Sequence, residues 1–198
     1  FERNTEVDHL VRTLDRSAAA DDVLQLQVSI AWYLRQRDNA RALALCETAK
    51  AVIAEQPASN TMRQFAARLK LIVAETRWLN SDLARATQLA QEAFSDFEFI
   101  KDAVGCADSF GLLAAVHNSA GDLPRRDAAL ANAVSNAMLA PDENRVICYE
   151  ANQARYATLR DTRMGSAQWF DRFQQHPGEL HPCASASVFS YFAARDHN

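Results

Sequence analysis

The chain has 198 residues, a formal net charge of -4 and a pI near 5.7, and 48% of its residues are hydrophobic. It contains 37 Ala but only five Gly and five Pro, and Ala loses no side-chain entropy in a helix. This composition excludes an all-β fold, a collagen-like chain and a long disordered polypeptide, and no apolar run reaches the roughly 20 residues that span a bilayer.

Apolar residues recur every three or four positions along the chain, which predicts amphipathic helices and no strand. Asn4 or Thr5 is expected to cap the first helix, and Asn39 to be the N-cap of the third. Gly121 is expected to end a helix in the left-handed conformation, and Pro124 suits a first helical turn. The ten predicted helices cover residues 7–14, 22–36, 40–55, 61–80, 83–97, 101–120, 124–139, 141–159, 163–175 and 182–195.

Aspartate recurs at the predicted turns with spacings of 44, 40 and 39 residues. Four positions after it a small residue follows in three of the four turns, whereas Arg126 occupies that place in the third. Small residues at fixed spacing let two helices approach closely, so the pattern predicts a stack of helical hairpins that bury one another's apolar faces. The aspartates are Asp38, Asp82, Asp122 and Asp161, and the small residues are Ala42, Ala86 and Gly165.

A turn of Gly-Asp-x-x-x-Ala type, with small residues at fixed offsets in both helices, resembles the tetratricopeptide repeat over residues 22–175. The repeats depart from that family because they are about 40 rather than about 34 residues long. Residues 30–38, Ile-Ala-Trp-Tyr-Leu-Arg-Gln-Arg-Asp, with Ala-Leu-Ala-Leu at 42–45, are similar to the opening repeat of sensory modules in bacterial signalling proteins. Those modules commonly precede a GGDEF diguanylate cyclase, and sometimes a helix-turn-helix regulator, and such an output would lie outside this chain.

The predicted fold is all-α: a right-handed superhelix of about four tetratricopeptide-like hairpins in a single domain over residues 1–198. A compact helical bundle is the alternative, although a bundle needs no internal repeat. The C-terminal helix carries several large apolar side chains, so it is expected to fold back on Trp169 and Phe170 or to pack on a second chain. The predicted parts are a cap helix within 1–20, repeats at 22–56, 61–99, 101–140 and 141–175, and a C-terminal helix at 182–195.

Side chains that could carry chemistry are scattered along the sequence. The four cysteines have long, irregular spacings and are expected to be reduced and mostly buried. His176, His181 and Cys183 lie close in sequence, but no fourth ligand is near, so no metal site is predicted. The sequence has no Gly-rich phosphate loop and no His-Glu-x-x-His or Gly-x-Ser-x-Gly motif, so no cofactor and no catalytic residue is predicted. Phe94, Phe97 and Phe99 are expected to form a core stripe, and Asp96, Glu98, Asp102 and Asp108 a solvated acidic face.

The favoured function is a non-catalytic protein-binding, peptide-binding or sensory module of a bacterial signalling protein, located in the cytoplasm. A small-molecule sensor and the interaction domain of a helix-turn-helix transcriptional regulator are the alternatives. The 18 Arg and three Lys are scattered, so no nucleic-acid partner is predicted. No membrane partner is predicted either, because the chain lacks a long apolar run. A homodimer is an open alternative. Because the chain begins at Phe1 without Met, it is expected to be a piece of a longer protein.

The resemblance also implies where a partner would bind, because the first helix of each tetratricopeptide pair lines the concave face. Polar groups on such an inner wall can hydrogen-bond an extended peptide. His117 is otherwise expected to be a solvated residue at a helix end. The candidates are polar residues about seven and eleven positions before each aspartate, together with polar residues near the helix ends. The predicted partner contacts are Gln27, Arg35, Glu75, His117, Asn118, Asn152 and Arg155.

Overall fold

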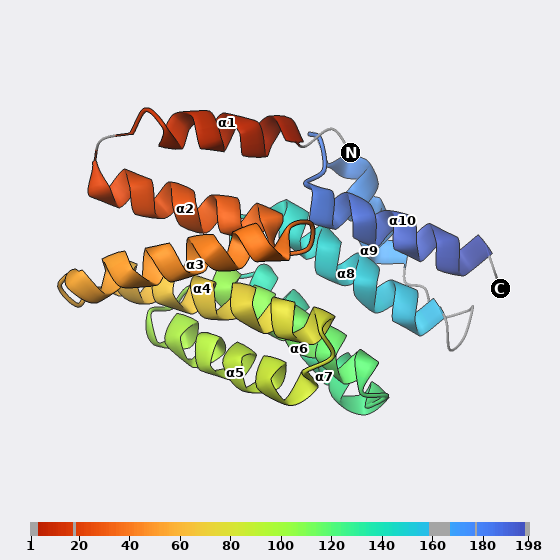
Figure 1. Cartoon of the computed structure of the whole chain (residues 1–198). Coiled ribbons are helices and arrows are strands. Elements are labelled where there is room, and N and C mark those ends of the chain that lie inside the picture. The colour runs from red at the N-terminus through yellow and green to blue at the C-terminus, as the bar shows by residue number, and fades with distance from the viewer. Residues whose placement is uncertain (1–3, 18, 159–166, 177, 197–198) are drawn as a thin grey trace. The chain divides into compact units, whose positions relative to one another are not determined.

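The computed structural model describes residues 4–17, 19–158, 167–176 and 178–196. These ranges form ten α-helices and contain no strand, which confirms the predicted all-α class (Figure 1). Within the same ranges, no helix is long and apolar enough to cross a membrane. The helices are α1 (Asn4–Leu14), α2 (Ala20–Leu34), α3 (Asn39–Glu55), α4 (Asn60–Leu79), α5 (Leu83–Phe99), α6 (Ala103–Ser119), α7 (Leu123–Ala137), α8 (Glu143–Thr158), α9 (Ala167–Gln175) and α10 (Pro182–Asp196).

The chain divides into two compact units, Phe1–Gly105 and Cys106–Asn198. In the first unit α1 packs on α2, α2 packs on α3 and α4, α3 packs on α4, and α4 packs on α5. In the second unit α7, α9 and α10 each pack on α8. The single domain over 1–198 and the superhelical arrangement stay predictions.

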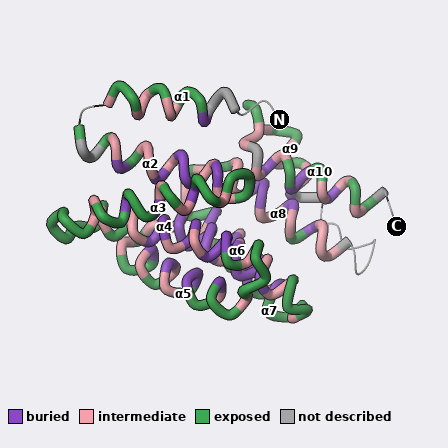
Figure 2. The backbone as a smooth tube through the Cα atoms, in the orientation of Figure 1, coloured by how far each residue is buried: buried purple, intermediate pink, exposed green. Residues whose placement is uncertain are grey.

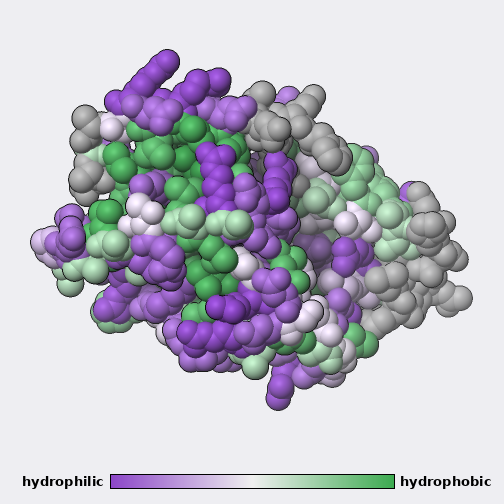
Figure 3. All heavy atoms as spheres, viewed as in Figure 1, coloured by the Kyte–Doolittle hydropathy of each residue, from purple (hydrophilic) through white to green (hydrophobic). Residues whose placement is uncertain are grey.

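The core of the first unit is aliphatic and its helices meet through alanine. Leu24, Ile30 and Ile72 are almost fully enclosed in it. Figure 2 shows the buried positions of α5 on its side toward α4 and the exposed ones on its outer side, and in Figure 3 hydrophobic side chains gather beneath the hydrophilic outer side of α1. Close approach of the helices explains why Ala occupies the repeated sites, since Ala42, Ala49, Ala86 and Ala93 have no exposed surface.

Three successive turns between helices share one backbone conformation. Ser81, Lys101 and Gly121 have φ angles of 62°, 62° and 74°, in the left-handed region that ends a helix. In each turn an aspartate follows the left-handed residue, and its amide donates to the carbonyl five residues earlier over 2.9 Å. These pairs are Asp82 with Arg77, Asp102 with Phe97, and Asp122 with His117.

The same aspartates begin the next helices. Each carboxylate accepts a hydrogen bond from the backbone amide three residues later, as an N-cap side chain does. Asp82 and Asp122, which the sequence comparison found, therefore act at helix starts, and so does Asp102, which it did not find. Asp38 also caps α3, through the Arg41 amide at 3.0 Å, so the predicted N-cap Asn39 is wrong by one residue. The other caps are Asp82 to Arg85 (3.2 Å), Asp102 to Gly105 (2.9 Å), Asp122 to Arg125 (3.1 Å) and Asp142 to Arg145 (3.2 Å).

Two of the left-handed residues carry side chains that this backbone disfavours. We expect Ser81→Gly and Lys101→Gly each to raise the free energy of unfolding by about 0.5 to 1 kcal/mol, because relief of the left-handed strain exceeds the entropy cost of Gly. Gly121→Ala should lower it by about 1 kcal/mol. Urea denaturation of the three variants measures these changes, and a loss of stability in both Gly variants would contradict the shared turn.

The fold-back of the last helix, expected from its aromatic content, is confirmed. Trp169 is buried on α9, and its ring lies edge-on to Tyr191 of α10, with 4.6 Å between the ring centroids. Phe170 lies 5.9 Å from Phe192 in the same way. Phe189 remains 74% exposed, because it points away from this cluster.

The structure differs from other sequence-based predictions at the ends of helices. Phe97 is fully buried as predicted, but Phe99 is 64% exposed and lies under the guanidinium of Arg63, 4.1 Å from the ring centroid. Helix α8 begins at Glu143 rather than at residue 141, because Asp142 caps it. The predicted turn at Asp161 and Gly165, and the predicted start of a helix at residue 163, lie outside the described residues.

Candidate functional site

Two guanidinium groups lie against one tyrosine ring in the second unit. The Cζ atoms of Arg126 and Arg155 are 4.2 Å and 4.4 Å from the ring centroid of Tyr156, within the range of cation–π attraction. Arg126 comes from the first turn of α7, and Arg155 and Tyr156 come from the last turn of α8. We call the group of Asn118, Arg126, Asp127, Arg155 and Tyr156 the Tyr156 cluster.

Arg126 is the buried member of the Tyr156 cluster. It stands at the repeat position that Ala42 and Ala86 occupy elsewhere, so its side chain needs internal partners. Its Nε and Nη2 donate to Oδ1 of Asp127 over 3.0 and 2.9 Å, and its Nη1 donates to Oδ1 of Asn118 over 3.2 Å. The charge of Arg126 is therefore compensated, and Arg126 fixes the amide group of Asn118 at the end of α6.

Arg155 has a different environment. Its Nε is buried and has no hydrogen-bond partner in the described part of the chain, and a buried donor without an acceptor costs about 1 to 3 kcal/mol. The carboxylate of Asp127 pairs with Arg126 instead. The Tyr156 cluster thus holds two positive groups, one carboxylate and one guanidinium nitrogen whose hydrogen-bonding capacity is unused.

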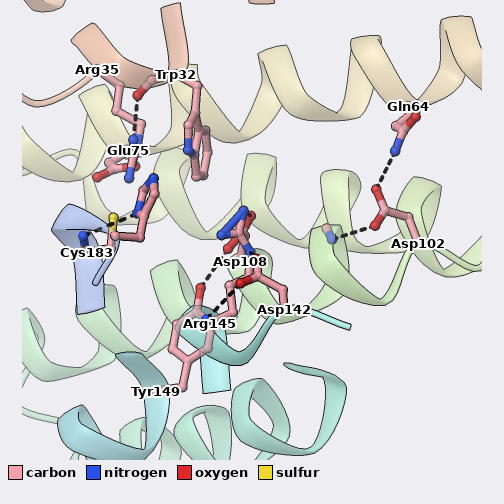
Figure 4. A network of polar contacts seen from close by, with 12 residues as sticks. Trp32, Arg35, Gln64, Glu75, Asp102, Asp108, Asp142, Arg145, Tyr149 and Cys183 are labelled. Atoms are coloured by element: carbon pink, nitrogen blue, oxygen red, sulfur yellow. Dashed lines mark hydrogen bonds and ion pairs between the residues drawn. The ribbon is translucent and has the colours of Figure 1, made fainter. Parts of the chain in front are cut away.

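A related arrangement in the first unit pairs one of its two guanidinium groups with a buried carboxylate (Figure 4). The guanidinium groups of Arg35 and Arg68 lie 3.7 and 4.7 Å from the ring centroid of Trp32. The buried carboxylate of Glu75 accepts a hydrogen bond from Nε of Arg35 over 2.6 Å and another from the Gln36 amide group. Arg35 and Glu75, which were predicted to contact a partner, therefore bind each other.

A third charged group joins α6 to α8, and it contradicts one prediction. Asp108 was expected on a solvated face, but it is buried and lies 3.0 Å from Nη2 of Arg145 (Figure 4). The Tyr149 hydroxyl donates to its carboxylate over 2.8 Å. Burial, and then the charge of Asp108, raise the pKa of Tyr149 well above its usual value. Burial lowers the pKa of Arg145, but the charges of Asp108 and other groups outweigh it, and the net shift is upward.

Two of the other acidic residues of the predicted acidic face also have protein partners, whereas Glu98 is exposed. Asp96 pairs with Lys70 over 2.8 Å, and Asp102 accepts from Gln64 over 2.9 Å in addition to capping α6. These contacts are partly exposed, so they fit the predicted solvated face better than Asp108 does.

The cysteines and histidines are placed as follows. All four cysteines are thiols, and three of them are buried. Burial raises the pKa of Cys46 to about 11 and that of Cys148 to about 12. His176 lies 3.0 Å from Glu143, and Nδ1 of His181 accepts from the Cys183 amide over 3.4 Å. Among the residues that the structure describes, no group of three or more His, Cys, Asp or Glu could hold a metal ion.

The remaining predicted contacts are separate from these clusters. Asn152 donates to Oγ of Ser187 over 2.8 Å and to the carbonyl of Cys148 over 3.0 Å. Oε1 of Gln27 is buried without a partner in the described residues, and His117 is half-buried at the end of α6.

The structure thus brings two predicted contacts together directly, Arg35 and Glu75. It links Asn118 to Arg155 only indirectly, through Arg126 and Tyr156. Sequence reasoning missed Arg126 and Tyr156 as site residues. The break in the small-residue pattern was a signal for Arg126, whereas Tyr156 gave none. No family model, curated protein or solved structure matches the chain.

Proposed function

We propose that this chain is a non-catalytic helical-repeat module that holds a peptide or protein segment. The observation that supports it most is the Tyr156 cluster, where a guanidinium with an unused donor and an oriented amide group come from two predicted inner helices. An extended segment carries carbonyl and side-chain acceptors that such groups bind.

The repeated turn geometry supports the tetratricopeptide-like superhelix that this proposal assumes. Three consecutive turns combine a left-handed residue with an aspartate cap, at intervals of about 20 residues. Successive antiparallel helices with equal turns generate a curved stack whose inner wall is lined by alternate helices. In this arrangement α6 and α8 are inner helices, and both contribute to the Tyr156 cluster.

The resemblance of residues 30–45 to sensory modules supports a place in a bacterial signalling protein. On this proposal, binding of the segment regulates an output domain outside this chain, such as a diguanylate cyclase. No catalytic role is assigned to residues of this chain, since a regulatory module acts through differential binding to two states of the whole protein.

Selection of displayed random 12-residue peptides on the purified chain tests the proposal. We expect enrichment of a sequence family that binds the wild type and loses at least tenfold in affinity to the double variant Asn118→Ala, Arg155→Ala. Gln153→Ala is the matched control, because Gln153 is exposed on α8 and lies outside the Tyr156 cluster. Failure to enrich any peptide family, or equal affinity for the double variant and the wild type, would contradict the proposal.

A further inference from the structure

We infer that the Tyr156 cluster binds a carboxylate, presented by an acidic residue of the bound segment. This inference rests on the proposed function and names the chemistry of the ligand at that site. It follows from a comparison of the arginines in the two units, and from the charge and geometry of the cluster.

Three other arginines that are largely buried each have a carboxylate of this chain close by. Arg35 has Glu75 at 2.6 Å, Arg145 has Asp108 at 3.0 Å and Arg126 has Asp127 at 2.9 Å. The carboxylate offsets the cost of holding a guanidinium away from water. Nε of Arg145 is buried without an acceptor as well, but Arg145 has Asp108 and Asp142 as counter-ions. Arg155 differs because its Nε is equally buried and unpartnered, and no carboxylate of the described residues forms an ion pair with it. The counter-ion that Arg155 lacks is therefore expected from a ligand.

The charge of the cluster favours one negative charge. Asp127 neutralises Arg126, so Arg155 is the only net positive charge among the five cluster residues. A carboxylate matches it, whereas a phosphate group carries about 1.5 to 2 negative charges at neutral pH.

The geometry of the cluster favours a planar anion. The two Nη groups of an arginine form a planar fork that binds the two oxygens of a carboxylate. The Tyr156 ring lies against the Arg155 guanidinium and restricts its orientation. Asn118 is held by Arg126 through Oδ1, which fixes the orientation of its amide group. Both contacts reduce the entropy lost when the anion binds.

Nuclear magnetic resonance of the ¹⁵N-labelled chain tests the inference, with acetate, inorganic phosphate and the peptide acetyl-Ala-Ala-Glu-Ala-Ala-amide as probes. The readout is the Nε–H signal of Arg155, assigned from its loss in Arg155→Lys. We expect a saturable shift with acetate and with the peptide, and binding of the peptide at least tenfold tighter than that of acetate. Phosphate should bind no more tightly than acetate.

Two variants distinguish a loss of ligand binding at Arg155 from a general loss of folding. Arg155→Lys keeps the charge but lacks the fork, and we expect it to weaken peptide binding about tenfold, as followed by backbone signals. Arg125→Gln is the matched control, because Arg125 is the exposed neighbour of Arg126 and should bind like the wild type. An unmoved Arg155 signal with every probe, or equal affinity of Arg155→Lys and wild type, would overturn the inference.

A failure of the carboxylate site can be distinguished from a failure of the proposed peptide binding. Displayed peptides without acidic residues, bound equally by wild type and Arg155→Lys, would overturn the carboxylate site and leave peptide binding intact. A saturable acetate shift with no tighter binding of the glutamate peptide would overturn the peptide source and favour a small carboxylic acid.

Discussion

We expect Asp108→Ala to lower the free energy of unfolding by about 3 to 5 kcal/mol, which is the usual cost of removing one partner of a buried ion pair. Arg145 would keep its charge in a largely buried place, and its other carboxylate neighbour, Asp142, lies 3.8 Å from Nε. Tyr149 would lose the acceptor of its hydroxyl group. Urea denaturation followed by circular dichroism measures the change.

Asp142→Ala is the matched control for this variant. It removes the cap of α8 and the longer contact with Arg145, and it should cost about 1 kcal/mol. The double variant Asp108→Leu, Arg145→Met should recover most of the loss, because a packed apolar pair can replace a buried ion pair. A loss in Asp108→Ala no larger than that in Asp142→Ala would show that the buried pair contributes little.

The helices and their turns could be predicted from the sequence because their causes are local. An aspartate cap acts on an amide three residues away, and the apolar period of a helix is visible within a few turns. The aspartate spacing therefore located Asp82 and Asp122 at helix starts, where the structure has them. The one-residue error at Asn39 has a local cause as well, since Asp38 and Asn39 are both good caps and only the hydrogen bond to Arg41 distinguishes them.

The clusters could not be predicted in the same way, because their members are distant in sequence. Asp108 is separated by 37 residues from Arg145 and by 41 from Tyr149. A lone carboxylate within the apolar stretch 103–116 was a sign of burial, but nothing near it indicated the partner. The predicted burial of Phe99 was wrong for a related reason, since its exposure depends on the position of the turn that follows it.

Within the Tyr156 cluster, Asn118 and Arg155 were predicted as polar residues near the ends of inner helices, whereas Arg126 was noted only as a break in the small-residue pattern. A charge at a site that the repeat reserves for Ala implies a partner that offsets the desolvation cost. Glu75 is the second such case, because Ala31, Ala115 and Ala154 hold the equivalent positions.

The repeat pattern and the structure make opposite predictions for Glu75→Ala. The pattern alone favours Ala at this site, since Ala packs there in the other repeats and has a high helix propensity. The contacts favour Glu75, because Arg35 and Gln36 both donate to its carboxylate and both charged side chains are nearly buried. We expect the contacts to dominate, and Glu75→Ala to lower the free energy of unfolding by about 3 kcal/mol.

A double-mutant cycle with Arg35→Ala separates the two effects. We expect the double variant Arg35→Ala, Glu75→Ala to be more stable than Glu75→Ala alone, because it removes the uncompensated guanidinium and leaves the alanine that the repeat accommodates. Glu47→Ala is the surface control: its pair with Lys50 is exposed, and its loss should change stability little. Glu75→Ala as stable as the wild type would show that the repeat, rather than the Arg35–Glu75 pair, determines stability at this site.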